Sequence, residues 1–429
     1  MPQFTDLSAE ELTSIKESAA ARLEAFRAKG VKLDMSRGKP GADQHDLSSE
    51  LFTNVTMESG VATEGGVDCR NYGLPFGIPE ARRLFGELLG VPAENVIVGG
   101  NSSLNMMFDT VSQGMLNGFG GSPWAAQGKV KFLCPAPGYD RHFGVCEYFG
   151  IEMIAVPMTG EGPDLDEVRR LAENDPMVKG MWCVPKYSNP QGITYSDDTV
   201  RALAALKPAA QDFRIFWDNA YAVHDLYEDR KDTLLNFYEE CKKQGREDMV
   251  FTFTSTSKIT FSSGGLAAMA ASERNCELLK KRISMQTIGP DKLNQLRHTR
   301  FLPDMAHVEE QMKRHAAIIA PKFQAVLQIL SERLGGRGIG EWTDPNGGYF
   351  ISFESRKGCA GRIVSVCREA GVTLTSAGAT YPYGKDPEDS NIRISPTFPP
   401  VDELREAIRV FCDAVEFVSA EKLLSETGK

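Results

Sequence analysis

Short apolar runs alternate with helical stretches along the middle of the chain. Six runs have the length and composition of buried strands, and they lie at residues 96–98, 130–134, 151–156, 180–184, 213–217 and 249–253. This alternation is typical of βαβ units. It predicts an α/β fold built on a largely parallel sheet.

Two helices can be delimited from their ends. Ser8 and Glu11 form a capping box in front of apolar residues at helical spacing, and the pattern ends at Gly30. A second amphipathic helix begins at Pro79 and ends at Gly90. Both helices carry one apolar face, so each must pack against another part of the protein.

The pattern changes beyond about residue 305. A long helix is followed by strand candidates at 347–353 and 391–394 and by a closing amphipathic helix. This order predicts a smaller α+β domain. We therefore divide the chain into an N-terminal helix and arm that join the small domain (1–50), a large domain (51–305) and a small domain (306–429).

Composition narrows the class of protein. The 429 residues are 41% hydrophobic and 25% charged, which is the mix of a globular protein and excludes a disordered or disulfide-built chain. The net charge of −10 argues against nucleic acid as a partner. No apolar run is long enough to span a membrane, and the N-terminus lacks the pattern of a targeting signal, so we expect a cytoplasmic protein.

Cysteine and histidine patterns give no sign of a metal site. The nine cysteines include no C-x-x-C pair, and the six histidines form no H-x-x-x-H or H-E-x-x-H pattern. We expect the cysteines to be buried thiols and expect no metal ligands.

Polar clusters follow five of the six strand candidates. They have the sequences GGNSS, PAPGYD, PKYSNPQG, DNAY and TSTSK. In an open α/β sheet, ligands bind beyond the carboxyl ends of the strands. The five clusters are therefore expected to face one cleft.

Three of these clusters contain side chains that could take part in a reaction or bind a ligand. Lys258 follows a β-rich run among hydroxyl side chains, and a lysine with a lowered pKa can form a Schiff base. Asp218 ends an apolar strand, where a carboxylate needs a cationic partner. Taken singly, Lys258 could be an exposed charge, Asp218 a helix cap and Asn189 part of a plain turn. Asn189, Asp218 and Lys258 follow one another along the chain, and one βα unit separates each from the next. This order favours a common site.

This order and spacing resemble those of fold type I pyridoxal phosphate enzymes, specifically class I aminotransferases. The greatest similarity is to the MocR-like subgroup of bacterial aspartate aminotransferases, and it extends from Gly38 to Arg393. The resemblance implies the PLP-transferase fold, with a mostly parallel seven-stranded sheet flanked by helices in the large domain and a smaller α+β domain. It also implies pyridoxal 5'-phosphate as cofactor and a homodimer with the active site at the subunit interface.

The resemblance assigns catalytic roles by position. Lys258 would form the Schiff base with the cofactor and, once released by substrate, carry the proton as catalytic base. Asp218 would pair with the protonated pyridine nitrogen and keep the ring an electron sink. Tyr221 and Asn189 would hydrogen-bond to the phenolic oxygen of the cofactor.

Further cofactor contacts follow from the same resemblance. Tyr139 would stack on the ring, and His142 would support Asp218 from behind. The phosphate would bind at the N-terminus of a helix, where backbone amides are available. Its expected partners are Asn101, Ser102, Ser103, the hydroxyl of Ser255 and, from the neighbouring subunit, Tyr72.

Substrate contacts are expected at three positions. Arg393 matches the arginine that binds the substrate α-carboxylate through a bidentate pair of hydrogen bonds, although a structural ion pair is the alternative. Gly38 would let the backbone approach the same carboxylate. Asn189 would lie beside both cofactor and substrate.

Two features depart from the family pattern. Gly265 and Leu266 stand where most class I members have a phosphate-binding arginine, so hydroxyls such as those of Ser262 or Ser263, or a basic residue from elsewhere, must replace it. No position matches securely the arginine that reads a distal carboxylate. The candidates are Arg37, Arg141, Lys292 and Arg297.

The resemblance implies an aminotransferase that moves an amino group from aspartate or glutamate to a 2-oxo acid. A decarboxylase or β-lyase would use the same cofactor and differ in which Cα bond breaks. A ligand-binding regulator is a further alternative, because related domains occur fused to DNA-binding modules. Here the segment before SRGKP is acidic, single-helical and too short for a winged helix.

Overall fold

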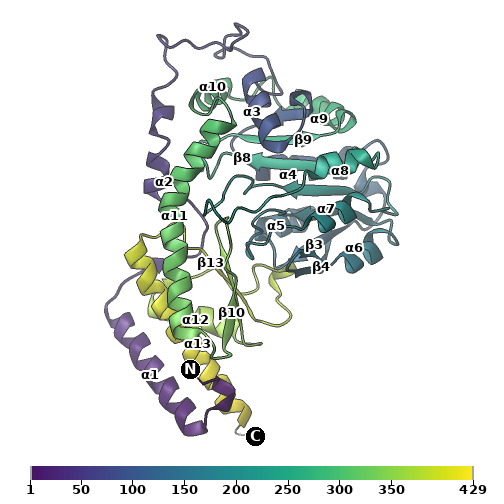
Figure 1. The fold of residues 1–429 in the computed structure, drawn as a ribbon. Coiled ribbons are helices and arrows are strands. Elements are labelled where there is room, and N and C mark those ends of the chain that lie inside the picture. Colours follow the sequence, from purple (N-terminus) through teal and green to yellow (C-terminus); the bar gives the residue numbers. More distant parts are fainter. Residues whose placement is uncertain (1, 428–429) are drawn as a thin grey trace.

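Residues 2–427 are described by the structure, a computed structural model (Figure 1). An eight-stranded sheet lies at its centre, with the strand order β2-β9-β8-β7-β6-β3-β4-β5. The strands are β2 (Val96–Val98), β3 (Lys131–Ala136), β4 (Glu152–Thr159), β5 (Gly162–Pro163), β6 (Val178–Cys183), β7 (Arg214–Asp218), β8 (Val250–Ser255) and β9 (Ala267–Ala271). Each of the six apolar runs forms one of these strands.

The direction of the strands matches the expected topology. Strands β8, β7, β6, β3 and β4 are parallel, and β9 runs antiparallel to both β8 and β2. The two-residue strand β5 turns back against the end of β4. The predicted seven-stranded, mostly parallel sheet is therefore confirmed, and β5 adds a short eighth strand at one edge.

Helices cover both faces of this sheet, which is why its strands are apolar on both sides. Phe132 and Phe216 pack in one core, whereas their neighbours Leu133 and Ile215 pack in another. The helices are α3 (Pro79–Leu89), α4 (Ser103–Asn117), α5 (Asp140–Tyr148), α6 (Leu165–Ala172), α7 (Asp197–Ala204), α8 (Phe237–Lys243), α9 (Glu273–Gln286) and α10 (Lys292–Phe301). Helix α3 begins and ends as predicted, with Gly90 in the left-handed conformation (φ 65°).

A second, smaller sheet has the order β10-β11-β13 and is antiparallel. It consists of β10 (Gly340–Trp342), β11 (Ile351–Ser355) and β13 (Asn391–Ile394). The expected strand at 347–353 begins only at Ile351, because Gly348 has a positive φ of 82° and packs against Tyr187. Strand β10 was not predicted.

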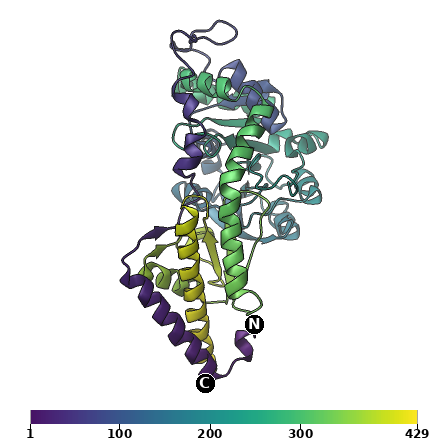
Figure 2. The same ribbon diagram turned by 60° about the vertical axis from the view of Figure 1, so that its left-hand side comes forward.

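Long helices pack around the small sheet. They are α1 (Ala9–Ala28), α11 (Met305–Leu334), α12 (Ala360–Ala370) and α13 (Val401–Thr427). The capping box of Ser8 and Glu11 is present at the start of α1, which lies along α13 although the two are at opposite ends of the chain (Figure 2). Helix α1 therefore packs with the small half of the molecule.

The remaining short elements connect these layers. Strand β1 (Leu33–Asp34) pairs with β12 (Val372–Thr373), and α2 (Ala42–Asp46) leads into an arm that extends away from the sheet (Figure 1). Single 3₁₀ turns lie at Phe4–Asp6, Ser49–Phe52, Ala93–Asn95, Trp124–Ala126, Glu247–Met249 and Pro382–Gly384.

Helix α11 joins the two halves of the molecule. Val308 and Met312 in its first turns pack with Leu84 and Leu302 of the large half. From Ile319 onward its apolar residues belong to the core of the small half. A boundary near residue 305 thus falls at the start of a helix that contributes to both cores.

All nine cysteines are buried and unpaired, as predicted. Between residues 2 and 427, no helix combines the length and the apolar character that a membrane crossing requires.

A buried ion cluster ties α1, α11 and α13 together. The side chains of Asp413 and Glu416 on α13 are only 8% and 6% exposed. Arg22 of α1 donates to both carboxylates, at 2.7 Å and 2.6 Å. Arg333 also donates to both, at 2.6 Å and 3.1 Å, and Arg337 donates to the second oxygen of Glu416. Five charged groups thus link the first and last helices to α11.

Replacing Glu416 should destabilise the small half. In Glu416→Gln, three arginines lose a carboxylate that is out of contact with water, and removing one partner of a buried pair costs about 3 kcal/mol. We expect a drop of several degrees in the first thermal transition. Glu24→Gln is the control, because its pair with Arg27 is exposed at 3.6 Å and should contribute little. Equal melting of the two variants would contradict this prediction.

Candidate active site

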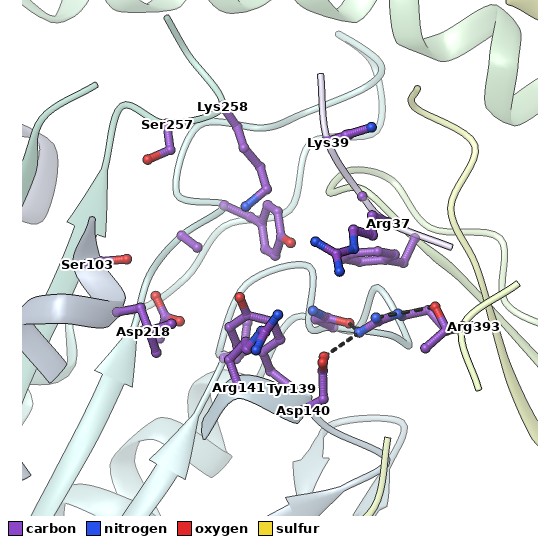
Figure 3. Close-up of a pocket in the computed structure, with 18 of the residues that line it drawn as sticks. Arg37, Lys39, Ser103, Tyr139, Asp140, Arg141, Asp218, Ser257, Lys258 and Arg393 are labelled. Atoms are coloured by element: carbon purple, nitrogen blue, oxygen red, sulfur yellow. Dashed lines mark hydrogen bonds and ion pairs between the residues drawn. The ribbon is translucent and has the colours of Figure 1, made fainter. Parts of the chain in front are cut away.

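A cavity of about 620 Å³ lies at the carboxyl ends of the parallel strands (Figure 3). All five polar clusters contribute to its lining, with Ser103, Tyr139, Asn189, Asp218 and Lys258 as representatives. The prediction that the clusters face one cleft is therefore confirmed. The small half closes the other side of the cavity, since Phe350, Thr375 and Arg393 also line it.

Lys258 projects into this cavity from the loop after β8. Its Nζ atom lies 5.0 Å from the ring centroid of Tyr221 and 5.6 Å from that of Tyr349. Within residues 2–427 no carboxylate lies at ion-pair distance from Nζ. Burial lowers the pKa of the Lys258 ammonium, and the Asp218 carboxylate opposes this effect. The lowered pKa raises the share of the neutral, nucleophilic amine.

Asp218 is the last residue of β7 and is buried. Its Oδ2 atom lies 3.0 Å from Nε2 of His142, whose ring stacks on Trp182 with centroids 4.4 Å apart. Its Oδ1 atom is also buried but has no hydrogen-bond partner in the part of the chain that the structure describes. A buried carboxylate oxygen is costly without a donor, so Oδ1 is available to an N–H group of a ligand.

Two tyrosines line the cavity near Asp218. Burial raises the pKa of Tyr139 to about 12, and it raises the pKa of Tyr221 well above its ordinary value. Both phenols therefore keep their protons at neutral pH and can donate hydrogen bonds. The Tyr139 ring also meets the His142 ring edge to face at 4.9 Å.

Arg393 enters the cavity from β13 of the small half and is 7% exposed. Its Nη1 atom donates to Oδ1 of Asn189 at 3.2 Å and to Oδ1 of Asp140 at 3.0 Å. The guanidinium lies over the ring of Phe350, with its central carbon 4.9 Å from the ring centroid. The same ring explains Gly38, because a Cβ atom there would lie 2.3 Å from Phe350.

The opposite end of the cavity is suited to an anion. Ser102 and Ser103 lie at the N-terminus of the 15-residue helix α4, where unpaired amides and the helix dipole attract negative charge. The hydroxyl of Ser255 donates to that of Ser257 at 3.1 Å. Ser257 in turn donates to the Asn101 carbonyl at 3.1 Å. Both hydroxyls line the cavity.

The hydroxyls proposed from sequence to replace the missing arginine lie elsewhere. Ser262 and Ser263 are not among the lining residues, and the Ser262 hydroxyl lies 3.3 Å from Nε2 of His45. Ser257 lines the cavity instead, because the turn after β8 directs it toward the start of α4. Its position next to Lys258 in TSTSK was the only sequence signal for it.

Several predicted residues lie outside the cavity. The Asn101 side chain donates instead to the Ser263 carbonyl at 2.8 Å, and His142 lies behind Asp218. Tyr72 is 76% exposed and lies in a separate surface hollow together with Lys292. Arg297 does not reach the cavity either.

Several residues that line the cavity had no role assigned from the sequence. They include Lys39, Asp140, Phe350 and Thr375. Asp140 lies within PAPGYD and Lys39 follows Gly38 in SRGKP, so both segments were recognised although these two residues were not. Phe350 and Thr375 come from loops of the small half, for which no local pattern indicated a site.

The fold and the site define the class of this protein. The α-aminoadipate aminotransferase of Thermus thermophilus, solved as a complex with N-(5'-phosphopyridoxyl)-L-leucine, superposes with a TM-score of 0.73. The match covers 95% of this chain and 98% of that chain at 20% identity. This is the fold of the type I pyridoxal phosphate enzymes.

Sequence similarity defines the family. The aspartate aminotransferase family model matches residues 7–427, and the chain belongs to this family. The chain is 46% identical over 426 residues to a Mycolicibacterium smegmatis protein classed as an aminotransferase, covering 99% of both. It is 42% identical to an aspartate transaminase of Corynebacterium glutamicum, whose structure superposes with a TM-score of 0.95 over 98% of this chain and 99% of that chain. Membership of the MocR-like subgroup stays a prediction.

Proposed function

We propose that this enzyme transfers the amino group of aspartate or glutamate to a 2-oxo acid, with pyridoxal 5'-phosphate bound to Lys258. The observation that carries the proposal is the arrangement of Lys258, the unpaired Oδ1 atom of Asp218 and Arg393 around one cavity. The name of the 42% identical relative, aspartate aminotransferase, supports the choice of substrate.

The residues present suit this cofactor. Asp218 offers a buried acceptor for the pyridine N–H, and Tyr139 offers an aromatic face. The N-terminus of α4 with Ser255 and Ser257 offers donors for the phosphate. When bound, pyridoxal phosphate supplies an electron sink for the negative charge that develops at the substrate Cα.

The chain's own groups then have separate tasks. Arg393 binds the α-carboxylate of the substrate and orients the Cα–H bond. With the cofactor bound, Lys258 would act as the general base that takes the proton from the substrate Cα and as the general acid that returns it. Tyr221 and Asn189 donate hydrogen bonds that stabilise negative charge on the ring oxygen.

The charge of the cavity supports an acidic substrate. Five cationic side chains and two carboxylates line it, and the cations are Arg37, Lys39, Arg141, Lys258 and Arg393. Lys258 and Arg393 are assigned to the cofactor and the α-carboxylate. Of the three that remain, Lys39 lies over the Phe398 ring, with its Nζ atom 3.8 Å from the ring centroid. Arg37 and Arg141 are therefore the preferred candidates for binding a distal carboxylate, ahead of Lys292 and Arg297.

A homodimer is part of this proposal. The arm after α2 carries exposed apolar side chains, including Phe52 at 76% and Tyr72 at 76% exposure. Large exposed apolar groups that lie close together are typical of protein interfaces. In a dimer, Tyr72 would reach the phosphate of the neighbouring subunit. Light scattering of the purified protein tests the oligomeric state.

The first experiment is a half-reaction followed by visible absorbance. Purified protein is loaded with pyridoxal phosphate and mixed with aspartate, glutamate or alanine. We expect rapid loss of the visible band with the two acidic donors and a response at least tenfold slower with alanine, because the distal cations are left without a partner. Equal rates would contradict acidic specificity, and an absent band would contradict the cofactor assignment. Release of pyruvate, ammonia or carbon dioxide without a 2-oxo acid would indicate a lyase or decarboxylase.

A further inference from the structure

An ion pair inside the cavity connects the two halves of the protein. Asp140 is the first residue of α5 in the large half, whereas Arg393 lies on β13 of the small half. Oδ1 of Asp140 lies 3.0 Å from Nη1 of Arg393, and the dashed line in Figure 3 marks this contact. The Asp140 side chain is 34% exposed, so its carboxylate has a route into solvent.

The donors of Arg393 are unequally available. Nη1 has two N–H groups, and these are directed to Asp140 and Asn189. Nε is buried and has no hydrogen-bond partner among the described residues. Nη2 makes only a long contact of 3.4 Å with Oγ1 of Thr375. A carboxylate that binds Nη1 and Nη2 together must therefore replace one acceptor on Nη1.

We propose that Asp140 is an internal counter-ion of Arg393 that the substrate α-carboxylate displaces, and that this competition lowers the affinity for carboxylate substrates. The inference rests on the proposed function, because it assigns the α-carboxylate to Arg393. Asn189 is held by its own role beside the cofactor, which leaves Asp140 as the group that moves. Asp140 can leave without loss of the helix, since a carboxylate in the first turn of α5 is favoured by the helix dipole.

Other contacts already hold the two halves together close to α5. The Gly138 amide donates to the Thr380 carbonyl at 2.7 Å, and the Met153 amide donates to the Tyr383 hydroxyl at 2.8 Å. Neither contact lies on Arg393. The Asp140–Arg393 pair is thus not required to join the two halves, and its place among the cavity-lining residues is better explained by competition with a ligand.

Competition of this kind lowers the affinity for every ligand that places a carboxylate on Arg393. Displacing Asp140 costs a monocarboxylate and a dicarboxylate the same free energy, because each places one carboxylate there. A dicarboxylate keeps its second attraction to the cations Arg37 and Arg141 in either case. Asp140 therefore changes the Kd of both classes by a similar factor, and the distal cations discriminate between them.

The test compares Asp140→Asn with Asp166→Asn. Asp166 lies in the first turn of α6 and is 97% exposed, so the control removes the same charge from an equivalent helix position away from the cavity. Binding of succinate and of propionate to the pyridoxal phosphate-loaded enzyme is measured by calorimetry. In Asp140→Asn we expect the Kd of succinate to fall about tenfold and that of propionate to fall by a similar factor, because a charged competitor becomes a neutral one.

Steady-state kinetics supply the second measurement. The KM for aspartate should fall in Asp140→Asn with kcat within about threefold of wild type, and the KM for alanine should fall by a similar factor. An unchanged or higher Kd for succinate would overturn the inference, as would an equal change in Asp166→Asn. A wild-type protein that binds succinate but has no transaminase activity would instead contradict the proposed function, which keeps the two failures distinct.

Discussion

Lys258→Ala should reduce transamination by roughly 10⁴-fold or more, because it removes both the amine that holds the cofactor and the base that moves the Cα proton. No other amine is placed to replace it, since the remaining cations of the cavity are arginines and Lys39 on the far side from Asp218 (Figure 3). Turnover is measured with aspartate and 2-oxoglutarate, and the visible spectrum reports the bound cofactor.

The control for this variant is Lys243→Ala. Lys243 is exposed on α8 and pairs with Glu240 at 2.6 Å, so its loss should leave turnover unchanged. Thermal melting of Lys258→Ala checks that the fold is retained. Normal turnover in a well-folded Lys258→Ala protein would remove the lysine from the reaction and with it the proposed chemistry.

Asp218→Asn should lower kcat by roughly 150- to 5000-fold. The carboxylate would hold a proton on the pyridine nitrogen of the cofactor. Loss of one partner of a buried charge pair costs about 3–5 kcal/mol, and an equal rise in the activation free energy lowers kcat by that factor. The hydrogen bond with His142 would also lose the negative charge of its acceptor. Single-turnover kinetics with aspartate separate this effect on chemistry from any effect on binding.

Asp218→Glu is the matched variant for this position. It keeps the charge but lengthens the side chain, so partial activity is expected, above that of Asp218→Asn. Cofactor content is measured in both variants by absorbance after denaturation. If Asp218→Asn retains wild-type kcat with bound cofactor, the unpaired Oδ1 atom has another purpose and the assignment is wrong.

Much of the large half could be predicted because its physical causes are local. Strands buried on both faces must be apolar throughout, so the six runs stood out from the helices between them. Caps are equally local, and both Ser8 and Gly90 end their helices where the sequence indicates. The parallel order then places Asp218 and Lys258 at the same edge of the sheet, because the carboxyl ends of parallel strands meet there.

The small half was harder to predict. Strand β10 has only three residues and follows a glycine-rich turn, so no period of two is long enough to recognise. The expected strand at 347–353 is shortened because Gly347 and Gly348 pack directly against Tyr187, a contact between distant segments. Short strands are set by their partners rather than by their own composition.

By itself, the sequence determined the order of the elements, the sheet edge that carries the site and the residue types that meet there. Only the tertiary structure decided which side chains share the cavity. It directs Ser257 toward α4, turns the Asn101 side chain away and pairs Asp140 with Arg393 across 253 residues of chain. Patterns of hydrophobic residues report local burial, whereas the pairing of charges across a cleft depends on how two separate cores are packed together.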